Sequence, residues 1–136
     1  MSLQHAQIVV DTPNACLWYY PDTKIIHHKF KQFMHGKEFR DFMTKAADTF
    51  IEKGSVKWLS DDRGNSALKQ DDIQWGLENW TPRVMQGGWK YWALLMPDKA
   101  LGKMNMRHLV EEYGKRGVTV EIFDDLEEAY AWLAGQ

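Results

Sequence analysis

The sequence predicts a single α/β domain in which helices pack on a mixed, mostly parallel sheet. Its 136 residues are 44% hydrophobic and 26% charged, the balance of a globular domain. No internal repeat or Pro/Gly-rich linker divides the chain. After three opening strands, helical and strand periodicities alternate, as they do in α/β proteins. We therefore expect residues 1–136 to form one domain.

The first quarter of the chain has the pattern of strands joined by short turns. Apolar or aromatic runs cover Gln7–Val10, Cys16–Tyr20 and Lys24–Phe30. Turn residues separate them, with Thr12-Pro13-Asn14 between the first two runs and Pro21-Asp22 between the second and third. Since short turns join antiparallel neighbours, we expect a three-stranded meander.

From His35 the hydrophobic period changes from two to 3.6 residues, which predicts a helix ending near Gly54. Strand and helix patterns then alternate to the end of the chain. Asp125 and Glu128 form a capping box that should start the last helix. The expected elements are a strand over Val56–Ser60, a helix over Asp72–Trp80, a buried strand over Trp89–Met96, a helix around Met106–Tyr113, an edge strand over Val118–Ile122 and the last helix.

This order, βββαβαβαβα, and several residue clusters resemble the SpoIIAA-like family of STAS-type domains, which are related to sporulation anti-sigma factor antagonists. The resemblance implies a STAS-like fold and a regulatory switch that binds a protein partner or a small ligand. A more distant similarity to CRAL-TRIO lipid-binding domains implies that the ligand is apolar. The clusters are Gly36–Lys53, Lys57-Trp58-Leu59-Ser60-Asp61-Asp62-Arg63, Trp75–Arg83, Leu95-Met96-Pro97, and Ile122-Phe123-Asp124 to Trp132-Leu133.

One departure from the family pattern concerns phosphorylation. The phosphorylated switches carry an Asp-x-Ser-Gly type motif where a strand runs into the next helix, whereas the corresponding loop here reads Ser60-Asp61-Asp62-Arg63-Gly64-Asn65-Ser66. Ser66 lies close to the expected helix start and is the candidate phosphoacceptor of this loop.

Polar residues directly after the strand Val56–Ser60 form the main candidate site. In open α/β sheets, ligands lie outside the carboxyl ends of the parallel strands. Asp61 or Asp62 could act as a general base, with Arg63 holding an anion. Alternatively, Arg63 pairs internally with one of the two aspartates and the loop caps the next helix. We expect Ser60, Asp61, Asp62, Arg63 and Ser66 to contribute to ligand or partner binding.

Two further residues are candidates for the same role. Trp75 lies off the helical stripe formed by Ile73, Leu77 and Trp80, so it is expected to face a surface, a ligand or a partner. Arg83, which follows Pro82, is a candidate for holding an anion. Trp80 and Trp92 are expected in the core.

Composition excludes several classes of function. The formal net charge is −2 and acidic and basic residues are interspersed, so the sequence predicts no basic patch for binding nucleic acid. No apolar stretch is long enough to span a membrane. The first ten residues also lack the basic and apolar regions of a signal peptide, so we expect a cytoplasmic protein. The single cysteine, Cys16, excludes an intrachain disulfide. The five histidines lack metal-ligand spacing, and no P-loop or dinucleotide fingerprint is present, so we expect no metal and no cofactor.

Three functional readings follow. The leading one is a non-enzymatic STAS-like domain that binds a protein partner or a small-molecule or lipid ligand, with the first helix and the loop Ser60–Ser66 as the responsive face. The second is a small enzyme that uses Asp61 or Asp62 as general base and Arg63 as anion holder. The third is a structural homodimer with exposed tryptophans at its interface.

Overall fold

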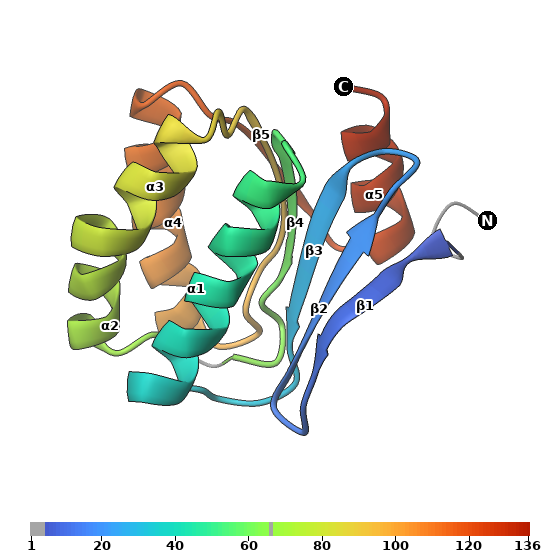
Figure 1. The fold of residues 1–136 in the computed structure, drawn as a ribbon. Helices are drawn as coiled ribbons and strands as arrows, with labels where there is room; N and C mark the ends of the chain where they lie inside the picture. Colours follow the sequence, from blue (N-terminus) through green and yellow to red (C-terminus); the bar gives the residue numbers. More distant parts are fainter. Residues whose placement is uncertain (1–4, 66) are drawn as a thin grey trace.

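A computed structural model describes residues 5–65 and 67–136, so the predicted phosphoacceptor Ser66 lies outside the described residues. The six strands of the described part form one sheet in the order β1-β2-β3-β4-β5-β6 (Figure 1). The strands are β1 (Gln7–Asp11), β2 (Ala15–Tyr20), β3 (Ile25–Phe30), β4 (Lys57–Asp61), β5 (Tyr91–Leu95) and β6 (Thr119–Phe123). The helices are α1 (Gly36–Glu52), α2 (Gln70–Trp75), η2 (Gly76–Trp80), α3 (Thr81–Gln86), α4 (Ala100–Lys115) and α5 (Leu126–Ala134).

The sheet is mixed, as the sequence predicts. β1, β2 and β3 form the antiparallel meander, whereas β3, β4, β5 and β6 run parallel. Each parallel connection passes through helical segments, because a parallel neighbour can be reached only by a crossover. The carboxyl ends of the four parallel strands therefore meet at one edge of the sheet. The predicted fold class is confirmed.

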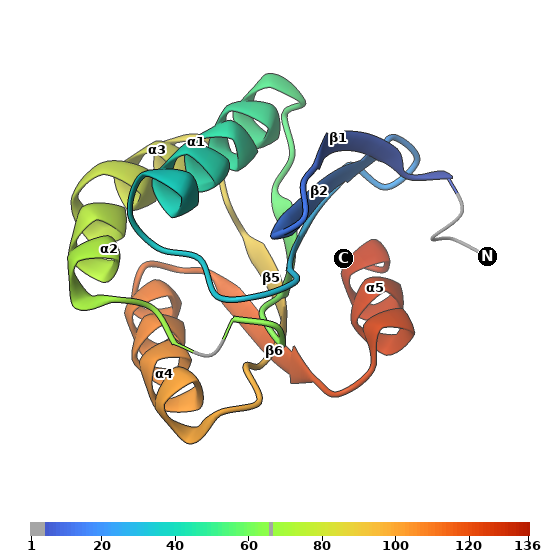
Figure 2. The same ribbon diagram turned by 90° about the horizontal axis from the view of Figure 1, so that it is seen from below.

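The helices cover the two faces of the sheet unequally. α1, α2, α3 and α4 lie on one face and α5 lies on the other (Figures 1 and 2). The start of α5 and the end of α1 agree with their sequence signals. Asp125 accepts a hydrogen bond from the Glu128 N–H at 2.9 Å, which confirms the predicted cap of α5. Gly54 has a φ of +65° just after α1, a conformation that glycine adopts at low cost.

The helical segment after β4 differs from its prediction. Instead of one helix ending at Trp80, α2, the π-helical turn η2 and α3 follow one another without a break from Gln70 to Gln86. Pro82 occupies the first turn of α3 and has no N–H to donate. A proline ring also clashes with the carbonyl of the preceding helical turn, and a π turn relieves that clash by widening the helix. The prediction that the helix ends at Trp80 is therefore wrong.

Successive side chains of the strands lie alternately in two separate hydrophobic cores, one on each face of the sheet. Ile26, Phe30, Trp58 and Trp92 belong to the large core under α1–α4. The smaller core under α5 is formed by Tyr20, Ile25, Leu59, Ala93, Ala129, Tyr130 and Leu133. His27 and His28 are both buried and lie on opposite faces of β3, as the strand period of two predicts.

Hydropathy gives no sign of a membrane span in residues 5–65 and 67–136, where no helix combines the length and apolar character that crossing a bilayer requires.

Candidate functional site

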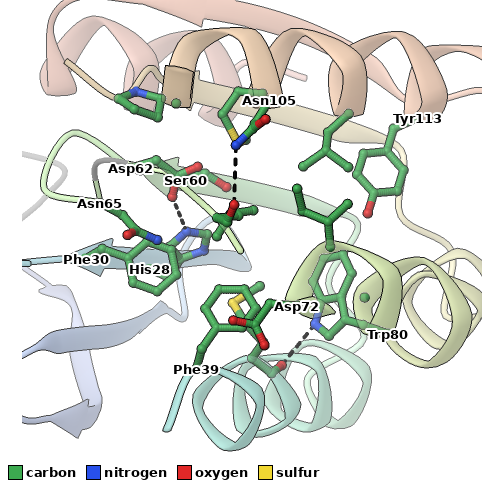
Figure 3. Close-up of a pocket in the computed structure, with 18 of the residues that line it drawn as sticks. His28, Phe30, Phe39, Ser60, Asp62, Asn65, Asp72, Trp80, Asn105 and Tyr113 are labelled. Carbon is green, nitrogen blue, oxygen red and sulfur yellow. Dashed lines mark hydrogen bonds and ion pairs between the residues drawn. The ribbon is translucent and has the colours of Figure 1, made fainter. Parts of the chain in front are cut away.

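A cavity of about 90 Å³ lies between the sheet and the helices α1, α2 and α4 (Figure 3). Its body is apolar and its walls come from segments far apart in the sequence. The residues that line it are His28, Phe30, Phe39, Met43, Trp58, Ser60, Asp62, Asn65, Ala67, Leu68, Asp72, Ile73, Trp75, Gly76, Leu77, Trp80, Trp89, Trp92, Pro97, Gly102, Asn105, Met106, Leu109 and Tyr113.

A chain of hydrogen bonds links a tryptophan, a histidine and an aspartate at the cavity wall. The Trp58 indole N–H donates to Nδ1 of His28 at 2.9 Å, and Nε2 of His28 lies 2.8 Å from Oδ1 of Asp62. An indole nitrogen can only donate, so Nδ1 must be the acceptor. The His28 ring that makes both bonds is therefore the neutral tautomer with its proton on Nε2, and it donates to the Asp62 carboxylate. All three side chains are buried.

The loop after β4 brings an amide side chain to the same cavity. Asn65 is 3% exposed, and its Oδ1 is buried without a hydrogen-bond partner among the described residues. Gly64 lets the loop approach β3, since a Cβ at this position would lie 2.2 Å from the Phe30 carbonyl oxygen. The Asp62 N–H also donates to the Leu95 carbonyl at 3.0 Å. The loop is thus fixed against two strands.

A second carboxylate, Asp72 of α2, lines the cavity and is fully paired. It accepts hydrogen bonds from the Gly36 N–H and from Nε of Arg40, each at 3.0 Å. The Arg40 guanidinium also lies 5.7 Å from the centre of the Trp75 ring, within cation–π range. Asp72 therefore ties α2 to the start of α1, and Arg40 balances its charge.

Aromatic rings form much of the cavity wall. The ring centres of Trp58 and Trp80 lie 5.2 Å apart, those of Trp80 and Trp89 lie 5.7 Å apart, and those of Trp89 and Trp92 lie 5.4 Å apart. The Trp92 N–H donates to the Ser60 hydroxyl at 2.8 Å and the Trp80 N–H donates to the Met43 carbonyl at 2.9 Å. With their indole N–H groups bonded, these rings contribute apolar surface to the wall.

Asp61 and Arg63 pair with each other, away from the cavity. Nε and Nη2 of Arg63 donate to the two carboxylate oxygens of Asp61 at 2.9 and 2.8 Å. Burial raises the pKa of Asp61, but the hydrogen bonds and charge of Arg63 outweigh it and hold the pKa below its ordinary value. Because Arg63 is engaged by Asp61, the arrangement corresponds to the internal pairing that the sequence left as an alternative.

The predicted site residues are thus divided among three places. Ser60, Asp62 and Trp75 line the cavity together. Asp61 is the last residue of β4 rather than a loop residue, so its side chain faces the opposite side of the sheet from Ser60. Arg83 is exposed and pairs with Asp48 of α1 at 2.6 Å. The structure does not bring Asp61, Arg63 or Arg83 to the cavity.

Sequence reasoning missed several polar residues of the cavity wall, among them His28, Asn65, Asp72 and Asn105. A lone histidine in a strand carries no motif. However, Phe30 is two residues from His28 on the same strand, which could have indicated that both side chains face the large core together with Trp58. Among the residues that the structure describes, no group of three or more His, Cys, Asp and Glu side chains could hold a metal ion. The site's chemistry is therefore that of an apolar cavity with hydrogen-bonding groups at one end.

Comparison with known proteins gives the family. The SpoIIAA-like family model matches residues 25–134, from β3 to α5. This chain belongs to the SpoIIAA-like family. The predicted resemblance is confirmed, and the match takes in every residue of the cavity wall as well as Asp61, Arg63 and Arg83. No curated protein matches the sequence significantly.

A solved structure supports the fold of this SpoIIAA-like chain. It is the crystal structure of a candidate anti-sigma factor antagonist from Thermotoga maritima, with a TM-score of 0.55 and 17% sequence identity. The alignment covers 80% of this chain and 86% of the other. At this identity the likeness shows a shared STAS-type fold alone.

Proposed function

We propose that this SpoIIAA-like domain is a regulatory binding module whose cavity takes a small, largely apolar ligand. The observation that carries the proposal is the cavity itself, which is walled by aromatic rings and supplied with hydrogen-bonding groups from His28, Asp62 and Asn65 at one end. Such a combination of an apolar body with a few polar groups is typical of small-molecule sites.

Binding is favoured over catalysis because His28 has no free lone pair and because Arg63, the anion holder of the enzyme reading, does not line the cavity with Asp62. Both of its ring nitrogens are occupied, one by the Trp58 N–H and the other by Asp62. A general base must have a free lone pair within reach of the substrate proton. Arg63, the expected anion holder of the enzyme reading, is bound to Asp61 on the other face. The enzyme reading therefore has less support than the binding reading.

The regulatory part of the proposal rests on the family and on exposed apolar side chains. Phe33 follows β3, and Leu101 and Met104 lie in the first turns of α4, which follows β5. Both segments leave the carboxyl edge of the sheet, where the cavity also lies. A protein partner or a second copy of the chain could cover this edge. Its affinity would then change when a ligand occupies the cavity.

Urea unfolding with and without ethylbenzene tests the proposal. At a free concentration ten times Kd, binding should raise the free energy of unfolding by about 1.4 kcal/mol. Met43→Trp, which fills the cavity from α1, should abolish the effect. Ile8→Ser, which removes an exposed apolar side chain on β1, should leave it intact. No stabilisation of the wild type, or equal stabilisation of Met43→Trp, would refute the proposal.

A further inference from the structure

The charges around the cavity are one-sided. Among the residues described as lining it, Asp62 and Asp72 are the only carboxylates, and no lysine or arginine lines it. Asp72 is balanced by Arg40, which pairs with it from outside the lining. Asp62 has no cationic partner of this kind, since its contact is the neutral His28 tautomer. The cavity wall therefore carries one carboxylate charge that no side chain of the wall offsets.

Two acceptor atoms beside that charge have no hydrogen-bond partner in the described part of the chain. His28 occupies Oδ1 of Asp62, and no hydrogen bond to Oδ2 is made within residues 5–65 and 67–136. Oδ1 of Asn65 is buried and also lacks a partner there. Figure 3 shows Asp62 and Asn65 at the same end of the cavity, beside His28. Buried acceptors such as Oδ1 of Asn65 are normally bonded in native proteins, so this end of the cavity lacks at least one donor.

The rest of the wall suits a cation as well. Trp58, Trp80, Trp89 and Trp92 also line the cavity, and the quadrupoles of aromatic rings attract ammonium groups in desolvated sites. A carboxylate or phosphate head would instead meet the Asp62 charge and the Asn65 oxygen, both of which repel it. The first turn of α4 would favour an anion, but it contributes only Gly102 to the wall.

We infer that the ligand of this cavity is an amine: an apolar body ending in an ammonium group that donates to Asp62 and Asn65. The inference rests on the proposed function and narrows it, because it excludes the anionic head groups of fatty acids and phospholipids. An ammonium supplies three donors and a positive charge, which matches two open acceptors and one uncompensated carboxylate.

Isothermal titration at pH 7 with three probes that share a phenylethyl group tests the inference. 2-Phenylethylamine carries an ammonium, 3-phenylpropanoate carries a carboxylate, and ethylbenzene has no polar head. For the wild type we expect the amine to bind about tenfold or more tighter than the carboxylate, as a charge-assisted hydrogen bond allows. Equal binding, or a preference for the carboxylate, would overturn the inference.

A matched pair of variants locates the effect. Asp62→Asn removes the charge in the cavity and should cut the amine preference about tenfold, with ethylbenzene binding unchanged. Asp61→Asn removes the neighbouring carboxylate on the other face and should leave the preference intact. A preference that survives Asp62→Asn contradicts the inference. If Asp62→Asn does not fold, Asn65→Leu takes its place. The comparison of amine and carboxylate binding to the wild type tests the inference without either variant.

The result separates the inference from the proposed function. If ethylbenzene binds and the amine is not preferred, the cavity is a ligand site and the amine assignment is wrong. If none of the three probes binds, both the amine assignment and the ligand site are wrong.

Discussion

The indole N–H of Trp58 and the Nδ1 atom of His28 are hydrogen-bonded at 2.9 Å across two adjacent parallel strands. This bond fixes the proton of His28 on Nε2 and directs it to Asp62. The orientation of the His28–Asp62 pair thus depends on one buried tryptophan. The ring centre of this Trp58 also lies 5.0 Å from that of Phe50 in α1.

Replacing that tryptophan tests its double role. Trp58→Phe leaves Nδ1 of His28 buried without a donor and opens space beside Phe50. We expect the free energy of unfolding to fall by about 2–4 kcal/mol, from the unsatisfied acceptor and the lost packing. Urea denaturation measures it. Trp132→Phe, at a half-buried position on α5, is the control and should cost less. Equal losses in the two variants would contradict the assigned role.

Gly64 is expected to be required for the loop's approach to β3. In Gly64→Ala, the new Cβ would meet the Phe30 carbonyl at 2.2 Å, so the loop must move and carry Asp62 and Asn65 with it. A destabilisation of about 2–4 kcal/mol is expected for such a backbone clash. Thermal unfolding and the NMR signals of His28 report the two effects.

Gly76→Ala serves as the comparison. Its Cβ would meet no atom within 4 Å and its backbone is helical, so alanine should be neutral or stabilising by about 0.5–1 kcal/mol. A Gly64→Ala protein as stable as Gly76→Ala would show that the loop does not need the close approach.

Much of the fold could be predicted because the relevant signals are local. The strand turns, the helical stripes and the Asp125 cap each involve residues close together in the sequence. The π turn before Pro82 could not, because periodicity does not report which register a helix uses to accommodate a proline. The fold of the chain was therefore predictable, apart from the limits of the segment between β4 and β5.

The site was only partly predictable, because the sequence placed the end of the strand β4 one residue too early. Placing the end of the strand at Ser60 put Asp61 and Asp62 together in a loop. In fact β4 continues to Asp61, so the alternation of strand side chains sends Asp61 to α5 and leaves Asp62 at the cavity. His28 could not be assigned because its partners, Trp58 and Asp62, are 30 and 34 residues away in the sequence.

The other histidine of β3 should make stability depend on pH. Burial lowers the pKa of His27 from 6.5 to about 3, whereas in the unfolded chain the group takes up a proton below pH 6.5. The unfolded state thus binds more protons between these values, so stability is lost as pH falls from 6.5. The slope approaches about 1.4 kcal/mol per pH unit for one proton.

His27→Gln isolates this contribution. Glutamine can still bond the Tyr20 hydroxyl, which lies 2.9 Å from Nδ1 of His27, but it does not titrate. Urea midpoints measured between pH 7 and pH 4 should fall less steeply in the variant than in the wild type. Parallel pH profiles would mean that His27 is not buried in its neutral form.

The cap of α5 gives a prediction for the far face of the sheet. Asp125→Ala removes the side chain that accepts from the Glu128 N–H and should cost about 1 kcal/mol. Asp124→Ala changes the same charge at the preceding exposed position and should cost little. Chemical denaturation compares the two, and equal costs would argue that charge rather than capping stabilises this helix start.

The central claim, that the cavity is a ligand site, is tested most directly by the indole N–H signals in a ¹H–¹⁵N NMR titration with ethylbenzene. Of the seven tryptophans, Trp58, Trp75, Trp80, Trp89 and Trp92 line the cavity, whereas Trp18 and Trp132 pack on the α5 face. Saturable shifts of the cavity signals with Trp18 and Trp132 unchanged are the predicted result. No shift, or shifts of Trp18 and Trp132 as large as those of the cavity group, would contradict the claim.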